Sequence, residues 1–306
     1  AADYPVYRVD RVLARRDAIY PATVVGKPIQ EDYHIGVALA AMSVPLLKLI
    51  RPAVVDLWAF PETGFHPLAA ISVKERYPRE ALKHTLGMLG EGQVSLTKVM
   101  VTTGPQVNVR DFKALSKAIW RHLDLETGLH LLAPTAQDTL DFTGPKMNTG
   151  SRLVLLAVGD EAAPLRSEPP PAPPGPAELG GHVRAVDTFG PAFLLVQVDD
   201  GLGEPETLRQ TLAQHPGTRD YLFHVILSDD VDLKDPVMTL WAWFTRFDPL
   251  ADLHPAERVV RGNRLCLRAP ILIDARWKKG YPRPVAFDPA VEKRVLDRWS
   301  QFGLPD

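Results

Sequence analysis

The sequence predicts an α/β protein made of two related α/β sandwich units, joined by a proline-rich linker and preceded by an orphan β-hairpin. Short apolar strands alternate with amphipathic helices along most of the chain, which is typical of a sheet covered by helices. A strand–turn–helix–strand pattern also recurs: Asp111 and Asp235 are 124 positions apart, as are Asp124 and Asp248. Two copies are too few for a solenoid and favour a pair packed about a pseudo-twofold axis.

Residues 1–28 contain the stretch VYRVDRVLARRDAIYPATVV, which predicts two strands joined by a charged turn at residues 14–17. Two strands alone are marginal in water, so this hairpin needs a sheet to join. No other predicted strand lies near it in sequence. Because the chain begins AADYPVY without a methionine, we expect that an N-terminal part has been removed.

Residues 29–50 predict a linking helix that Pro45 should kink. Glu31 and Asp32 suit the positive end of its dipole. Apolar residues recur along it at helical spacing, at Ile35, Leu39, Met42 and Leu46.

Residues 51–163 then alternate between strands and helices as the first α/β unit. Seven prolines within residues 164–176 predict a stiff, extended linker over residues 164–178. The second unit spans residues 179–285. Residues 286–306 predict a C-terminal helix with an apolar stripe at Val291, Val295, Leu296 and Trp299.

Composition excludes several classes of function. A formal net charge of -2 offers no electrostatic reason to bind nucleic acid. We find no apolar run long enough to span a bilayer and expect no stable membrane insertion. The single cysteine, Cys266, excludes internal disulfides and fits a reducing, cytoplasmic compartment. Its strand-like flanks predict a buried, inert thiol.

Residue spacing alone gives only weak evidence for a catalytic, phosphate-binding or metal-binding site. The stretch TGPKMNTGSR (143–152) could cradle a phosphate, but a surface turn explains it better. Glu62 and His66 could form an acid/base pair, or simply lie in a solvated turn. The SDDVD run (228–232) fits a solvated turn better than a cation site, and the histidines show no metal-ligand spacing.

Four longer segments occur in order along the chain: DAIYPATVVGKPIQEDYHIG, PAVVDLWAFPETGFHPLAAISVKERYP, LTKVMVTTGPQVNVRDF and DTLDFTGPKMNTGS. Together they resemble the UbiD-like decarboxylases, and the resemblance runs from about Tyr4 to Val158. The C-terminal stretch IDARWKKGYPRPVAFDPAVEKRVLDRW is similar to the closing segment of that family. The extended, duplicated C-terminal region is most similar to the menaquinone-pathway members.

This resemblance implies decarboxylation of an aromatic acid, of the hydroxynaphthoate type, on prenylated FMN that a divalent metal helps to hold. The family's glutamates and arginine would lie upstream of Ala1, so no catalytic residue is assigned to this chain. Residues 1–28 would be the last strands of a split β-barrel whose remainder, a flavin-binding domain, is missing. We therefore expect a C-terminal half that is inactive alone, binds no cofactor or metal alone, and self-associates as a homo-oligomer.

Positions that line the substrate pocket in the family carry over by motif to six residues of this chain. They are His34, Ile35, Val94, Thr97, Thr135 and Gln137. Thr97 and Thr135 could instead only end a strand and cap a turn. Lys98 could steer a carboxylate by its charge, but a solvated lysine at a strand end is the simpler interpretation. The alternative function is a non-catalytic assembly or binding subunit of a multi-chain decarboxylase.

Overall fold

The computed structural model describes residues 5–20, 22 and 26–303. Its contacts divide the chain into two compact units, one of residues 1–26 and 284–306 and one of residues 27–283. The larger unit holds both sheets and almost all of the core.

The first sheet has the strand order β1-β2-β3-β5-β4. Its strands are β1 (Val54–Ala59), β2 (Leu68–Val73), β3 (Val99–Thr103), β4 (Leu129–Ala136) and β5 (Thr149–Ala157). The three central strands run parallel, and β1 and β4 are antiparallel edges. The crossover from β2 to β3 is α2 (Glu80–Met88), because parallel neighbours need a long connection.

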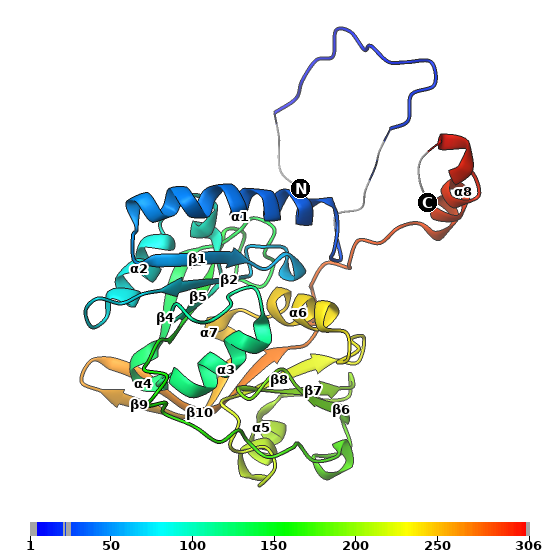
Figure 1. Cartoon of the computed structure of the whole chain (residues 1–306). Helices are drawn as coiled ribbons and strands as arrows, with labels where there is room; N and C mark the ends of the chain where they lie inside the picture. The colour runs from blue at the N-terminus through cyan, green and yellow to red at the C-terminus, as the bar shows by residue number, and fades with distance from the viewer. Residues whose placement is uncertain (1–4, 21, 23–25, 304–306) are drawn as a thin grey trace. The chain divides into compact units, whose positions relative to one another are not determined.

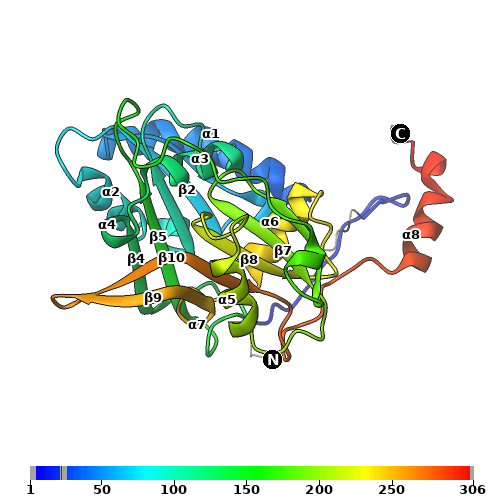
Figure 2. The same ribbon diagram turned by 90° about the horizontal axis from the view of Figure 1, so that it is seen from below.

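The second sheet repeats this order as β6-β7-β8-β10-β9. Its strands are β6 (Val183–Thr188), β7 (Phe193–Val198), β8 (Phe223–Ser228), β9 (Leu253–Arg261) and β10 (Arg264–Ala275), with α5 (Glu206–Gln214) between β7 and β8. The predicted pair of α/β units is therefore confirmed. The β9–β10 hairpin projects beyond its neighbours (Figure 2).

The aspartates that revealed the repeat are helix caps. Asp111 caps α3 (Phe112–His122) and Asp235 caps α6 (Pro236–Thr245), each by accepting a backbone N–H bond. Asp124 and Asp248 do the same for the short helices α4 (Leu125–Gly128) and α7 (Pro249–Asp252). Since a cap satisfies otherwise unpaired N–H groups, its sequence position marks the start of the helix in both copies.

The two sheets share one hydrophobic core, which lies between them with α3 and α6 (Figure 1). At its centre Phe112 of α3 stacks on Phe193 of β7 at 5.6 Å between ring centroids, and meets Trp243 of α6 edge-on at 5.6 Å. The outer faces are covered separately, by α1 (Glu31–Ile50) and α2 on the first sheet and by α5 on the second. The order of layers is thus helix, sheet, helix, sheet, helix.

The two α/β units also exchange contacts. The short helix α4 of the first unit packs on β10 of the second, and α7 of the second packs on β5 of the first. Ser151 of β5 donates its hydroxyl to Asp248 Oδ1 at 2.8 Å, and its backbone N–H bonds the other carboxylate oxygen. This reciprocity is what a pseudo-twofold pair requires.

The linker is docked on both α/β units. As predicted, residues 164–175 form neither helix nor strand, and the 3₁₀ turn η3 (Pro176–Glu178) ends the segment. Trp120 donates its indole N–H to Glu168 O at 3.1 Å, and Tyr221 donates its hydroxyl to Pro171 O at 2.8 Å.

The predicted N-terminal hairpin is wrong for the part of it that the structure describes, because residues 5–20 form no strand. Only the turn at Arg16 and Asp17 is present. An isolated pair of strands has no sheet to complete its backbone hydrogen bonds, which is the physical reason it does not form in this chain. The remainder of the second predicted strand lies mostly outside the described residues.

Two helices differ from expectation. The helix α1 keeps its predicted span and continues through Pro45, but only Val44 on it is buried. Contrary to the sequence analysis, its 20 residues are long and apolar enough to cross a membrane, a property of length and composition only. The predicted C-terminal helix is shorter: α8 covers Pro289–Leu296, and the 3₁₀ turn η4 (Trp299–Phe302) follows.

Candidate functional site

Polar side chains gather at the amino edge of the first sheet. His66 precedes β2, Lys98 precedes β3, and residues 137–148 form the loop that leads into β5. Because these three strands are parallel, their starts lie at one edge of the sheet. We call the following residues the amino-edge cluster: His66, Lys98, Gln137, Asp138, Asp141 and Thr143.

Lys98 is the buried cation of this cluster. Its side chain is 1% exposed, and its Nζ lies 2.8 Å from Asp141 Oδ2. The ammonium also lies over the ring of Phe247, which comes from the second unit. The interpretation of Lys98 as a solvated lysine is therefore wrong: tertiary packing brings an acidic partner that lies 43 positions away. Burial acts to raise the pKa of Asp141, but Lys98 and the Thr143 donors outweigh it and hold that pKa below its ordinary value.

Thr143 orders the hydrogen bonds around this ion pair. Its hydroxyl donates to Asp141 Oδ1 at 2.6 Å, so its oxygen is left to accept from Gln137 Nε2 at 3.3 Å. Because the Gln137 amide donates to Thr143 through Nε2, the orientation of the amide is fixed. Its Oε1 is buried and, among the described residues, has no hydrogen-bond partner. A Cβ at Gly150 would overlap that oxygen, so a side chain there would displace the Gln137 amide.

His66 pairs with Asp138 and not with Glu62. The Nδ1 of His66 donates to Asp138 Oδ2, while Asp138 Oδ1 accepts from the backbone N–H of Leu140 at 2.9 Å. The predicted Glu62–His66 pair is thus not formed. Glu62 Oε2 is instead buried without a partner in the described part of the chain, and burial raises the pKa of its carboxyl group.

The six predicted pocket positions do not all meet. Thr97 and Gln137 are buried at the amino edge, beside Lys98 and Asp138 respectively. Thr135 pairs with Gly150 across β4 and β5, and Val94 packs into the outer core with α2. His34 and Ile35 are exposed on α1. Their neighbour Gly36 contacts Phe65, the residue before His66, so α1 lies against the segment that carries that histidine.

The sequence analysis missed Asp138, Asp141 and Thr143. All three belong to DTLDFTG, a stretch that served as a family motif, and Thr143 also opens the 143–152 stretch that was interpreted as a surface turn. Its two carboxylates three positions apart were the available signal, because a loop of this kind that enters a parallel strand can hold side chains at the sheet edge.

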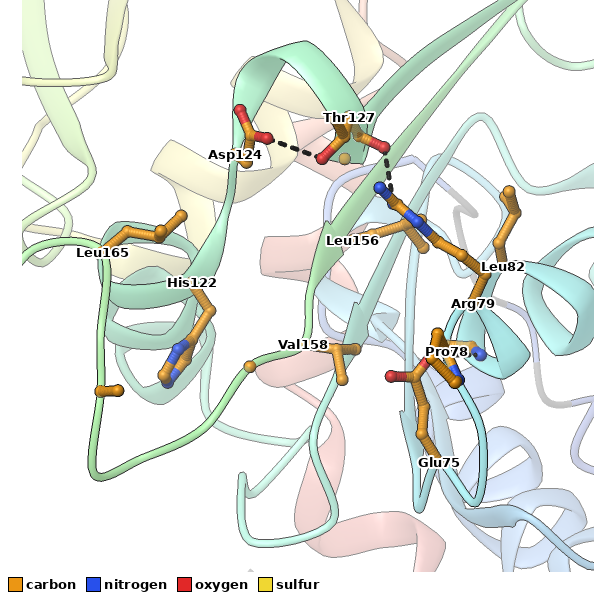
Figure 3. A pocket seen from close by; sticks show the side chains of 14 residues that line it. Glu75, Pro78, Arg79, Leu82, His122, Asp124, Thr127, Leu156, Val158 and Leu165 are labelled. Atoms are coloured by element: carbon orange, nitrogen blue, oxygen red, sulfur yellow. Dashed lines mark hydrogen bonds between the residues drawn. The ribbon is translucent and has the colours of Figure 1, made fainter.

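A hollow lies at the opposite, carboxyl edge of the first sheet. This cavity of about 330 Å³ is drawn in Figure 3, with side chains from α2, α4 and the segment after β5 around it. Arg79 donates to the Thr127 carbonyl at 3.0 Å, and Asp124 accepts from the Thr127 hydroxyl at 2.7 Å. His122 contacts Glu161 at 3.0 Å. The polar groups around this cavity are thus largely paired with one another.

Neither edge offers a fit for a flavin phosphate held by a metal ion. Within residues 5–20, 22 and 26–303, no group of three His, Cys, Asp or Glu side chains is arranged to bind a metal. The amino-edge cluster is closed by its own ion pairs, and Gln137 Oε1 is an acceptor that a phosphate would repel. The side chains that the structure describes therefore support no chemical step through such a group.

Comparison with known proteins gives one family match. Residues 33–157 match the family model described as the 3-octaprenyl-4-hydroxybenzoate carboxy-lyase C-terminal domain, UbiD_C. An uncharacterized protein of Chlamydia muridarum is 37% identical over 98% of this chain. A Chlamydia pneumoniae protein, named as a subunit of 4-hydroxybenzoate decarboxylase, is 36% identical over 98%. The chain spans about half of the length of these relatives, 50% in each case.

Solved structures resemble the chain only partly. The vanillic acid decarboxylase of Sedimentibacter hydroxybenzoicus in closed form aligns with a TM-score of 0.39 and 18% identity, over 46% of this chain and 28% of the other. The UbiD-class enzyme HmfF of Pelotomaculum thermopropionicum, in complex with FMN, gives 0.37 and 17%, over 43% and 28%. Likenesses this low do not bear on the function of the chain.

Proposed function

We propose that this chain is the C-terminal half of a UbiD-type decarboxylase of aromatic acids, in which it supplies one wall of the substrate pocket and an oligomerisation surface. One observation carries the proposal. The chain is similar over 98% of its length to a protein named as a subunit of 4-hydroxybenzoate decarboxylase, and it spans 50% of that protein. The match of residues 33–157 to a carboxy-lyase C-terminal domain supports the same reaction class.

The amino edge of the first sheet is the proposed wall. Thr97 and Gln137 lie there, and the polar cluster around them suits a hydroxylated ring better than a purely apolar one. His34, Ile35, Val94 and Thr135 complete the proposed set, with α1 as the element that faces the rest of the enzyme. The finer proposal for the substrate is a hydroxynaphthoate-type acid of a menaquinone pathway.

The cofactor belongs to the other half of the proposed enzyme. Prenylated FMN and its divalent metal would be held by an N-terminal flavin-binding domain, and this chain alone would release no CO2. We place the enzyme in the cytoplasm, where the buried thiol of Cys266 stays reduced.

A decarboxylation assay that compares the complete protein with this chain tests the proposed function. The complete protein, loaded with prenylated FMN, is assayed for CO2 release from 4-hydroxybenzoate and from dihydroxynaphthoates, beside this 306-residue chain alone. We expect release only from the complete protein. If the cofactor is demonstrably bound and no aromatic acid loses CO2, the proposal is wrong.

A second candidate is a non-catalytic assembly subunit of a multi-chain decarboxylase. The core shared by the two α/β units favours it, since the second unit occupies a place that a neighbouring copy could otherwise take. Both candidates predict self-association through exposed apolar residues of α8, Val291, Val295 and Leu296. Light scattering that shows a strict monomer at high concentration would contradict the self-association.

A further inference from the structure

His66 is held in one orientation by three separate contacts. Its side chain bonds Asp138, its backbone N–H donates to Gly64 O at 2.9 Å, and its carbonyl accepts from Lys98 N at 3.0 Å. Phe65, just before it, adopts the left-handed region at φ 68°, which is rare for a residue with a side chain. The backbone therefore aims this imidazole in a direction that ordinary extended chain would not give.

Asp138 in turn is held by a backbone hydrogen bond, which its Oδ1 accepts from Leu140 N. Among the described residues, its carboxylate has no ion-pair partner other than His66. Because a carboxylate can only accept, the proton between them must reside on Nδ1 of the ring. In the neutral ring Nε2 then carries the lone pair, and no hydrogen bond joins it to another described residue.

The side chain that carries this nitrogen is partly exposed. The His66 side chain is 27% exposed and that of Asp138 is 17% exposed, at the edge where Gln137 and Thr97 also lie. His224, by contrast, is completely buried, with its pKa lowered to about 4 by burial. His84 and His122 are also buried. Only histidines that are both ordered and reachable can exchange a proton with a bound molecule.

The closest comparison within the chain is His182. It also pairs with an aspartate, Asp199, at 2.9 Å, but its side chain is 52% exposed. Asp199 additionally forms an ion pair with Arg184, so its charge is shared. This second His–Asp pair belongs to the other sheet, and it provides a matched control.

We propose that His66, positioned by Asp138, is the proton acceptor for a ring hydroxyl of the aromatic acid substrate. Nε2 takes the proton from the hydroxyl, the O–H electron pair stays on oxygen, and the imidazolium is balanced by the Asp138 carboxylate. When CO2 leaves, the electron pair of the broken C–C bond stays on the ring carbon, which takes up a proton from solvent, and the proton on Nε2 returns to the oxygen. This step rests on the proposed function and narrows its substrates to acids that carry a free hydroxyl.

The kinetic test uses the full-length protein with its cofactor and compares 4-hydroxybenzoate with 4-methoxybenzoate, which has no proton to give. His66→Gln is expected to lower kcat for the hydroxylated acid by about 10²- to 10⁴-fold and to remove the preference over the methoxy acid. Asp138→Asn should act in the same direction, while His182→Gln should leave both rates unchanged. Equal losses on both acids in His66→Gln would overturn the proposal and assign His66 a structural role.

A second readout does not depend on activity. In the 306-residue chain, ¹⁵N–¹H correlation of the histidine rings should show His66 protonated at Nδ1 and unprotonated at Nε2, and Asp138→Asn should abolish this pattern. The opposite tautomer in the wild-type chain would overturn the proposed proton path. If the tautomer is as expected but the full-length wild type decarboxylates no acid, it is the proposed function that fails, and the proton-acceptor role fails with it.

Discussion

Lys98 and Asp141 form an ion pair that is almost fully removed from water, with side chains 1% and 7% exposed. Taking charges out of water costs several kcal/mol per ion, which only good geometry and further hydrogen bonds repay. Thr143 supplies one such bond to Asp141 and Phe247 faces the ammonium. The pair therefore joins the 137–148 loop to β3 and to the second unit.

Lys98→Met tests how much this pair stabilises the fold. The substitution leaves the Asp141 carboxylate buried and unpaired, so we expect the free energy of unfolding to fall by about 3–5 kcal/mol. The double variant Lys98→Met with Asp141→Leu should regain part of that loss, because no charge then remains. Urea denaturation measures both.

The matched control is Lys293→Met, which breaks the exposed Lys293–Asp297 pair of α8. We expect no measurable change there. A Lys98→Met variant as stable as this control would show that Asp141 is solvated in solution.

His224 makes the stability of the chain depend on pH. Burial lowers its pKa from 6.5 to about 4, so between these values the unfolded chain binds a proton that the folded chain does not. Its contribution is complete above pH 6.5 and is lost as the pH falls toward 4, by at most about 3 kcal/mol. His224→Gln should flatten the stability profile over this window in urea denaturation at several pH values, and an unchanged slope would contradict the assignment.

At the scale of single residues, the sequence could predict features that depend on neighbouring positions in the chain. The capping aspartates obey a rule about neighbouring residues, so the 124-position spacing of Asp111 and Asp235 marked the same helix start in both units. The partners of Lys98 and His66 were not predictable, because each lies on a loop more than 40 positions away that only the folded sheet brings near.

Among the elements, the 137–148 loop carries most of the candidate site, and its single glycine, Gly144, is needed for close packing. A Cβ on Gly144 would overlap the backbone carbonyl of Thr149, which cannot rotate away. Gly144→Ala should therefore destabilise the chain by about 1–3 kcal/mol and shift the Asp138 and Gln137 signals in NMR spectra.

Gly181→Ala is the control for this loop, because nothing lies within 4 Å of the added carbon and its φ is not in the left-handed region. We expect a change within about 0.5 kcal/mol. If Gly144→Ala behaves like Gly181→Ala, the loop is more open than the structure shows.

The proline-rich linker is an element whose docking the sequence did not predict. Composition indicated its extended form, but the two aromatic donors that hold it, Trp120 and Tyr221, come from different units.

Tyr221→Phe removes one hydrogen bond and should lower the free energy of unfolding by about 1 kcal/mol. Limited proteolysis should then cut within residues 164–175 faster than in Tyr77→Phe, whose hydroxyl is on the surface and only accepts from Lys83. Equal cutting rates would show that the hydroxyl does not hold the linker.

For the molecule as a whole, the internal repeat predicted two units with one topology, and the structure has them. Two features lay beyond sequence reasoning. The exposed apolar surface of α1 depends on which side of the helix meets β1, and strand formation in residues 5–20 depends on which other strands can pair with them. In both cases the missing information concerns a partner surface and not a local preference.

The shared core decides how residues 27–283 unfold. Phe112 of the first unit and Phe193 and Trp243 of the second lie in one buried cluster, and the short helices α4 and α7 each pack on the other unit. Separating the units would expose this cluster on both, and apolar burial is worth about 25 cal/mol per Å². We therefore expect one cooperative transition for residues 27–283, with tryptophan fluorescence and far-ultraviolet circular dichroism coincident in urea.

Residues 27–163 expressed alone should bind a hydrophobic dye and lack a cooperative transition. Two separate transitions in the intact chain, or a well-folded isolated first unit, would mean that the units are independent domains and that the second does not complete the core of the first.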